Sequence, residues 1–91
     1  MFAVVVRESG DAKAIDASWD LVIANVAPRV AQAPGFVSAL WMSDRAGRTL
    51  NILTFDSEEA AMAALEAARS TPRPPFMNVQ GVEVRQVMAT A

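Results

Sequence analysis

The side chains best suited to hold or transform a small molecule gather between Pro34 and Ser57. Asn51 interrupts an otherwise apolar segment, and a buried amide needs hydrogen-bond partners to be stable. If Asn51 shares a face with Trp41 and Phe55, its amide can orient an aromatic or enolic ligand on which the indole stacks. We therefore name Trp41, Asn51 and Phe55 as candidate ligand-binding residues, and Asn51 as the candidate catalytic residue. In the alternative interpretation Asn51 bonds to backbone or water at a sheet margin, and Trp41 packs in the core.

Several residue types that usually carry catalysis are absent from the chain. Without cysteine there is no disulfide, thiolate metal site or cysteine nucleophile, and without histidine the commonest metal ligand and general base are missing. We therefore expect neither a metal site nor a cofactor, and we interpret the acidic run at 56–59 as a capped helix start. A further hypothesis assigns acid–base chemistry to Glu8, Glu83 or Arg85, but we interpret all three as solvated residues at strand ends or edges.

Length and charge limit the classes of protein to which the chain can belong. Its 91 residues, 53% of them hydrophobic, support one core and hence a single domain over residues 1–91. Acidic and basic residues are mixed, with a net charge of -2, so the basic stripe that nucleic acids require is missing. No segment approaches the roughly 20 apolar residues of a membrane span. Arg7 and Glu8 end the apolar start too early for a signal peptide, and we expect a cytoplasmic protein.

The periodicity of apolar residues predicts a strand followed by a helix in the first third of the chain. Residues 2–7 are mostly β-branched and apolar, as in a buried strand. From Asp16 onward the spacing changes to three and four residues, which predicts one helical stripe formed by Trp19, Val22, Ile23, Val26 and Val30. Pro28 lacks a backbone donor, so we expect it to kink or divide this helix. We interpret Trp19 as a core residue, with a ligand platform as the alternative.

Residues 36–43 and 48–55 are predicted to form a hairpin. The connection at 44–47, DRAG, fits a type I turn followed by a left-handed glycine, which places Asp44 opposite Arg48. This register puts Trp41 opposite Asn51 and Val37 opposite Phe55 on one face. On the other face it predicts that residues 42, 40 and 38 lie opposite residues 50, 52 and 54.

The remaining elements complete a recognisable order. A second helix begins at Asp56, where Asp56 and Glu59 have the spacing of a capping box, and the proline-rich segment 70–75 ends it. A last strand is predicted over residues 82–88. The order strand, helix, strand, strand, helix, strand predicts an α+β, ferredoxin-like βαββαβ sandwich, with a four-stranded antiparallel sheet and two helices on one face.

Two helices cover only one face of such a sheet, yet the predicted hairpin is apolar on both faces. The uncovered side is formed by Phe36, Leu40, Met42, Leu50 and Ile52. Left in water, these side chains make a large apolar patch, of the kind that marks interaction sites. We therefore predict a homodimer in which this sheet face packs against its copy around a two-fold axis.

The same segments resemble a known family. The PGFVSALW entry to the second strand, the TFDSEEAAMAAL step into the second helix and the closing VEVRQVMA resemble the dimeric α/β-barrel proteins. Among these they are most similar to the antibiotic-biosynthesis-monooxygenase-like (ABM) group. The resemblance covers nearly the whole chain and implies a ferredoxin-like subunit that pairs through its sheet. The family includes cofactor-free oxygenases of polycyclic phenols, haem-degrading enzymes and small proteins without an established reaction.

The resemblance carries over unevenly to individual residues. The haem-degrading branch uses a histidine ligand that this chain lacks, and Phe55 stands where its members carry Trp, so we do not expect haem degradation. The cofactor-free oxygenases use Asn and Trp, together with Tyr, to hold a phenolic substrate that itself activates oxygen. Asn51 and Trp41 supply two of these residue types, whereas tyrosine is absent from the chain.

Two functions follow from the sequence. In the first, the protein is a small dimer that binds a hydrophobic or aromatic molecule, with a cofactor-independent monooxygenase as its enzymatic form. In the second, it is a non-catalytic dimeric module for structure or interaction. The interior discriminates between them, because a space of a few hundred Å³ between sheet and helices favours ligand binding and a filled one favours the module.

Overall fold

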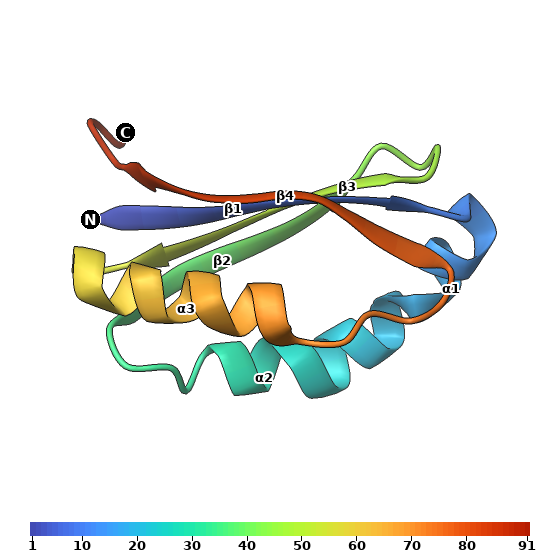
Figure 1. Ribbon diagram of the computed structural model, residues 1–91, viewed down its shortest axis with the longest axis horizontal. Helices are drawn as coiled ribbons and strands as arrows, with labels where there is room; N and C mark the ends of the chain where they lie inside the picture. Colours follow the sequence, from blue (N-terminus) through green and yellow to red (C-terminus); the bar gives the residue numbers. More distant parts are fainter.

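A twisted antiparallel sheet with all helices on one side forms the framework of the protein (Figure 1). The computed structural model describes residues 1–91. Its strands are β1 (Phe2–Gly10), β2 (Phe36–Ser43), β3 (Arg48–Phe55) and β4 (Met77–Gln86), in the spatial order β2-β3-β1-β4. Its helical segments are α1 (Ala12–Leu21), the π-helix η1 (Val22–Val26), α2 (Ala27–Val30) and α3 (Glu58–Ser70). The predicted ferredoxin-like βαββαβ fold is confirmed, with the first helix made of three consecutive segments.

The core lies between α3 and the middle of the sheet. Alternation along β1 turns Val4 and Val6 toward the helices, where they meet Phe55, Ala61 and Leu65 in one buried cluster. The small Ala61 side chain lets the helix approach the sheet closely. Ser57 caps α3 by accepting a hydrogen bond from the backbone N–H of Ala60, at 3.1 Å. The prediction of Asp56 as the capping residue is therefore wrong by one position.

The first helix changes its winding just ahead of Pro28, as the sequence led us to expect. It begins earlier than predicted, at Ala12, because the Asp11 carboxylate caps it through the backbone N–H of Ala14 at 2.9 Å. Over Val22–Val26 the helix widens into a π-helix, and the N–H of Ala27 bonds to the carbonyl of Val22. Pro28 lacks a backbone donor and its ring crowds the preceding turn, so a wider turn there relieves the clash.

The central hairpin follows the predicted register over most of its length. Trp41 lies opposite Asn51, and the predicted pairs on the outer face are all found. A β-bulge between Phe36 and Ser38 changes the end of the hairpin, so that Phe36 rather than Val37 lies opposite Phe55. The Phe36 ring packs edge-on against the Phe55 ring, with centroids 6.2 Å apart, and Val37 is exposed. The assignment of Phe36 to the outer, dimer-forming face is therefore wrong, because the bulge turns its side chain into the core.

The loop between β2 and β3 differs from the predicted type I turn. The Asp44 carboxylate accepts the backbone N–H groups of Ala46, at 2.8 Å, and Arg48, at 3.0 Å, while Arg45 adopts a left-handed conformation with φ 62°. These backbone bonds hold the pKa of Asp44 below its ordinary value. Gly47 is left-handed as expected, with φ 96°, and a Cβ there would lie 2.5 Å from the carbonyl oxygen of Gly10.

The last strand starts earlier than predicted, at Met77, and ends at Gln86. A bulge opposite Arg7 and Glu8 shifts the pairing of its first residues with β1. Among the helices, none has the length and apolarity that crossing a bilayer requires.

Candidate functional site

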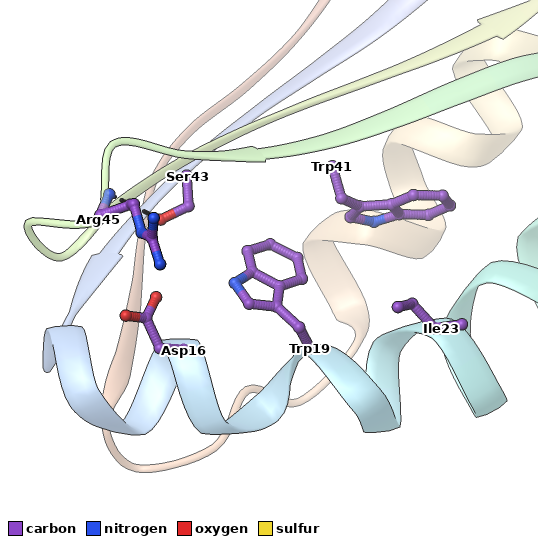
Figure 2. A pocket seen from close by; sticks show the side chains of 6 residues that line it. All are labelled: Asp16, Trp19, Ile23, Trp41, Ser43 and Arg45. Carbon is purple, nitrogen blue, oxygen red and sulfur yellow. Dashed lines mark hydrogen bonds between the residues drawn. The ribbon is translucent and has the colours of Figure 1, made fainter.

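The helices cover the sheet unevenly, and a groove lies under the first of them. The last helix, α3, packs against β1, β3 and β4, whereas α1 and η1 make their main contacts with the adjoining helical segments. Between α1–η1 and the end of β2 lies a groove of about 500 Å³ that opens to solvent (Figure 2). Its lining residues are Asp16, Trp19, Ile23, Trp41, Ser43 and Arg45.

The groove has an apolar part and a polar end. Figure 2 shows the indoles of Trp19 and Trp41 on opposite sides of it, with Ile23 beside Trp41 and with Asp16 and Arg45 at the far end. The interpretation of Trp19 as a core residue is wrong, because its partly exposed ring lines the groove together with Ile23, which is 68% exposed. The first turns of α1 are anchored by the buried Ile15, whereas Asp16 and Trp19 of the same helix line the groove.

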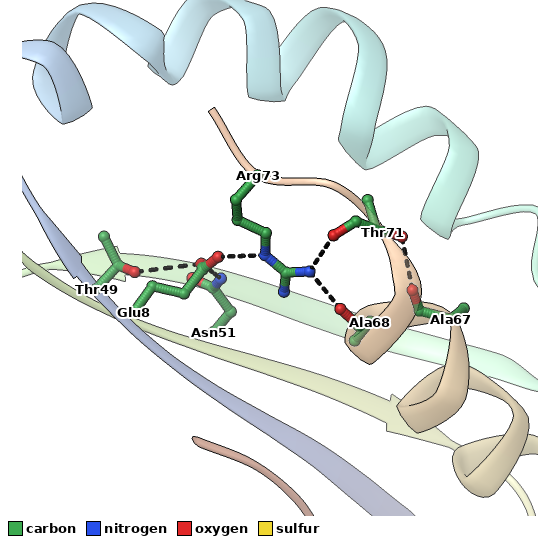
Figure 3. Close-up of polar contacts among 7 residues, drawn as sticks. All are labelled: Glu8, Thr49, Asn51, Ala67, Ala68, Thr71 and Arg73. Carbon is green, nitrogen blue, oxygen red and sulfur yellow. Dashed lines mark hydrogen bonds and ion pairs between the residues drawn. The ribbon is translucent and has the colours of Figure 1, made fainter. Parts of the chain in front are cut away.

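A buried carboxylate lies in the same layer between sheet and helices. Glu8 and Asn51 are each 8% exposed and Thr49 is 5% exposed. The carboxylate oxygen Oε1 of Glu8 accepts hydrogen bonds from Asn51 Nδ2 at 3.0 Å and from Thr49 Oγ1 at 3.4 Å (Figure 3). These three residues lie side by side on β1 and β3, where the register pairs Glu8 with Thr49. They form a polar island on a face that is otherwise apolar.

Arg73 joins this island to the end of α3. Its Nε donates to Glu8 Oε2 at 2.9 Å, and its side chain is only 16% exposed. Its terminal NH1 group donates to the carbonyl oxygens of Ala68 and Thr71, which the end of the helix leaves without intrahelical partners (Figure 3). The ion pair therefore fixes the proline-rich segment after α3 against the inner face of the sheet.

One atom of the polar island has no partner within the protein. Asn51 Oδ1 is buried and accepts no hydrogen bond, although the amide nitrogen of the same side chain is bonded. Asn51 lies directly opposite Trp41, whose ring lines the groove. Side chains opposite each other in an antiparallel pair have Cβ atoms about 5 Å apart. Asn51 is therefore the direct neighbour of Trp41 on the next strand, although it is not itself among the residues that line the groove.

The structure separates the three candidate site residues by environment. Trp41 lines the groove, and Asn51 belongs to the adjoining polar island. Phe55 is fully enclosed in the core beneath α3 and does not reach the groove. The register therefore brings Trp41 and Asn51 together, while Phe55 supports the sheet from the far end of β3.

Of the buried ion pair, Glu8 was named from the sequence only as a weaker acid–base candidate, and Arg73 was not named as a functional residue. Glu8 was interpreted as a solvated strand-end residue, and this is wrong, since strand alternation places it on the same inner face as Val4 and Val6. That alternation was a usable signal. Arg73 lies among prolines in a segment without periodicity, so no local pattern indicates that its side chain turns inward.

The other two acid–base candidates lie on the opposite face of the sheet. Glu83 and Arg85 are on the edge strand β4, as expected, and Glu83 binds Arg7 at 2.7 Å and Arg85 at 2.5 Å. The hydrogen bond from Arg7 holds the pKa of Glu83 below its ordinary value. No three His, Cys, Asp or Glu side chains come together as a metal-binding group.

Comparisons with known proteins place the fold. No family model and no curated protein sequence matches the chain. Among solved structures, it is similar to a monooxygenase from the gene ActVA-Orf6 of Streptomyces coelicolor, in complex with nanaomycin D, at 19% identity and a TM-score of 0.63. The match covers 99% of this chain and 89% of that one.

Two further solved structures have the same architecture. The cofactor-independent oxygenase SnoaB from Streptomyces nogalater matches at 19% identity with a TM-score of 0.64, covering 98% of this chain and 94% of that one. The heme degrader MhuD from Mycobacterium tuberculosis, with two hemes bound in its active site, matches at 18% identity with a TM-score of 0.67, covering 100% and 99%. Identities this low establish the fold alone.

Proposed function

Because the fold is that of antibiotic-biosynthesis-monooxygenase-type proteins, we propose that this protein binds a flat, apolar small molecule in the groove beneath α1 and η1. The observation that carries the proposal is the groove itself, about 500 Å³ and lined by two indoles, one from the helix and one from the sheet. Ligand pockets of a few hundred Å³ with aromatic walls and few polar groups are typical of small-molecule sites. The space under α1 and η1 is open rather than filled by side chains, which supports ligand binding over a purely structural module.

Each residue has a distinct role in the proposed site. Trp19 and Trp41 supply aromatic contacts to a planar ligand, and Ile23 extends the apolar wall. Asn51, beside Trp41, supplies the polar contact at the inner end. Phe55 keeps β3 in place from within the core.

A cofactor-independent oxygenation is the enzymatic form of this proposal. In such a reaction a reduced aromatic ligand supplies the electrons itself: a ring CH₂ becomes C=O, one atom of O₂ enters the ligand, and the other leaves with two hydrogens as water. The groove would hold the ligand, and Asn51 would orient the oxygenated ring position. Similarity in fold to a cofactor-independent oxygenase supports this form. Haem is not proposed as a ligand, because the chain contains no histidine.

Binding can be measured through the two tryptophans, which are the only ones in the chain and both line the groove. Adding naphthol should shift both indole N–H resonances in NMR spectra, and calorimetry should give its affinity. Ile23→Ala should weaken binding roughly tenfold through lost apolar contact. Leu21→Ala is the matched control, since Leu21 is 64% exposed and Ile23 is 68% exposed, but only Ile23 lines the groove. Equal effects of the two variants, or unshifted indole signals, would reject the site.

We also propose that two copies associate through the outer sheet face. Without Phe36, that face still presents the exposed Leu40 and Met42 beside Leu50 and Ile52 of β3. Such a patch favours association with a like surface. Met42→Glu should shift the sedimentation coefficient from dimer to monomer at micromolar concentration. Met62→Glu is the control, because Met62 is similarly exposed, at 44% against 37%, but lies on α3. A wild-type monomer in sedimentation would contradict the proposal.

A further inference from the structure

We infer that Glu8 is a positioning residue: it binds the nitrogen end of the Asn51 amide so that the oxygen end points away from the carboxylate, and it thereby makes the proposed ligand site selective for hydrogen-bond donors. The inference rests on the proposed function, because it concerns the polarity of the ligand that the groove accepts. It starts from the pairing of the two side chains, which lie on neighbouring strands β1 and β3.

The amide of asparagine has two different ends, and a partner determines which end is used. The nitrogen carries two N–H donors, whereas the oxygen only accepts. A carboxylate paired with an arginine also only accepts, so Glu8 Oε1 binds the Nδ2 end of Asn51 at 3.0 Å. A flipped amide would set its oxygen against the carboxylate oxygen, and two acceptors repel. The flip is therefore excluded as long as Glu8 carries its charge.

Glu8 itself has no freedom to turn away. Its second oxygen, Oε2, accepts from Arg73 Nε at 2.9 Å, and Thr49 Oγ1 approaches Oε1 at 3.4 Å. Arg73 is held in turn by the carbonyl groups of Ala68 and Thr71 at the end of α3. The chain of contacts from the helix end to Asn51 is buried or nearly so throughout its charged part. It fixes one orientation of one amide.

The consequence is that the oxygen of Asn51 is a buried hydrogen-bond acceptor without a donor. Asn51 Oδ1 has no partner in the protein, and Asn51 is more than nine-tenths buried. A ligand hydroxyl or N–H that reaches this oxygen completes its hydrogen bonding, whereas a ligand carbonyl or ether oxygen meets a second acceptor. The site therefore selects phenols and enols over their ethers and over quinone-type carbonyls. One hydrogen bond of ordinary strength corresponds to about a tenfold difference in affinity.

The decisive variant is Glu8→Gln, which keeps the shape of the side chain and removes its charge. Arg73 donates to Glu8 and would keep the oxygen of the new amide on its own side, so the new NH₂ group would face Asn51. The Asn51 amide then flips to accept from it and presents its nitrogen to the ligand. We expect wild type to bind naphthol about tenfold more tightly than methoxynaphthalene, and Glu8→Gln to lose or invert that preference. A merely structural role of Glu8 would weaken both ligands alike.

Glu83→Gln is the matched control, because Glu83 is also a carboxylate bound to arginine but lies on the outer face of the sheet. It should keep the wild-type preference. A folded Glu8→Gln variant with the wild-type preference would overturn the inference, and so would a wild type that binds both ligands equally. In that last case the proposed function survives, whereas a wild type that binds neither ligand rejects both.

A measurement on the wild-type protein guards against a variant that fails to fold. The side-chain NH₂ protons of Asn51 should exchange slowly with solvent before ligand is added, because one of them is bound to Glu8. Naphthol should leave their NMR shifts nearly unchanged, since it binds the oxygen end. Rapid exchange, or a large shift of the NH₂ protons with naphthol, would overturn the inference.

Discussion

The two ends of the layer between sheet and helices are built from similar apolar residues and have opposite outcomes. Beneath α3 the space is filled, and Phe55 and Ala61 are completely enclosed. Beneath α1 and η1 it is a groove walled by Trp19 and Trp41. The difference lies in how near the helix comes. Alanines let α3 lie close to the strands, whereas a tryptophan and a widened π-turn hold the first helix away.

This contrast suggests why large side chains do not guarantee a larger core. A short side chain such as that of Ala61 brings two backbones together, so neighbouring residues fill the remaining space. Trp19 instead spans the distance between layers and leaves room beside its ring. We therefore expect the filled region to carry most of the stability.

The largest expected effect is in the filled half. Phe55→Ala should lower the free energy of unfolding by about 3–5 kcal/mol, because it removes a fully buried ring that Phe36 packs against. Ile23→Ala, in the groove, should change it by less than about 0.5 kcal/mol. Urea denaturation measures both. Comparable losses in the two variants would show that the groove half is also packed in solution.

A second test concerns the ion pair that links the two halves. Arg73→Met should lower the free energy of unfolding by about 3 kcal/mol, since it leaves the Glu8 carboxylate buried without its cation. Adding Glu8→Leu to this variant should recover part of the loss, because the unpaired charge is then gone. Chemical denaturation of the single and double variants measures the coupling. A double variant as unstable as the sum of the two single variants would contradict a buried pair.

A third test addresses why the first helix stands off. Pro28→Ala supplies the missing backbone donor, so the π-turn over Val22–Val26 should revert toward α-helix and stability should rise by about 1 kcal/mol. Reverting the turn rotates Ile23 relative to the sheet and should weaken naphthol binding. Helical content by circular dichroism and affinity by calorimetry report the two effects. An unchanged affinity at increased helicity would separate the π-turn from the groove.

The smallest effect is expected at the loop that closes the polar end of the groove. The pKa of Asp44 is lowered in the folded protein by its bonds to the N–H groups of Ala46 and Arg48. A lowered folded pKa means that the stabilisation is present above the unfolded value of about 3.9 and is lost as pH falls through the folded value. The stability difference between wild type and Asp44→Ala should therefore shrink on acidification below that value. A stability difference between the two proteins that grows as pH falls would contradict a lowered pKa of Asp44 in the folded protein.

Much of the framework was readable from local patterns. Apolar alternation and the glycine of the hairpin loop predicted the pairing of Trp41 with Asn51, even though the loop itself takes another shape at Arg45. That register survives because it depends on where the loop ends and not on each of its dihedral angles. The prediction placed Phe36 on the wrong face because a bulge adds one residue to one strand there. The residues around the bulge carry no pattern that indicates it.

The candidate site was only half readable. The polar residue Asn51 in an apolar strand drew attention to the right face, and alternation along β1 would have added Glu8. Arg73 approaches Glu8 from a segment 65 residues further along the chain, where prolines erase any periodicity. Arg73 meets Glu8 because α3 ends above that part of the sheet, and the position of the helix end depends on how helices and sheet pack together.

The sequence by itself determined the order of the elements, the strand pairing at Trp41 and Asn51 and the absence of histidine, cysteine and tyrosine chemistry. These follow from periodicity, turn chemistry and composition, which act between near neighbours. Only the tertiary structure decided that the stripe with Trp19 and Ile23 borders a groove and that Asn51 keeps a free oxygen. The separation of helix and sheet and the meeting of distant charges depend on how all the layers fit together, and no single segment encodes that fit.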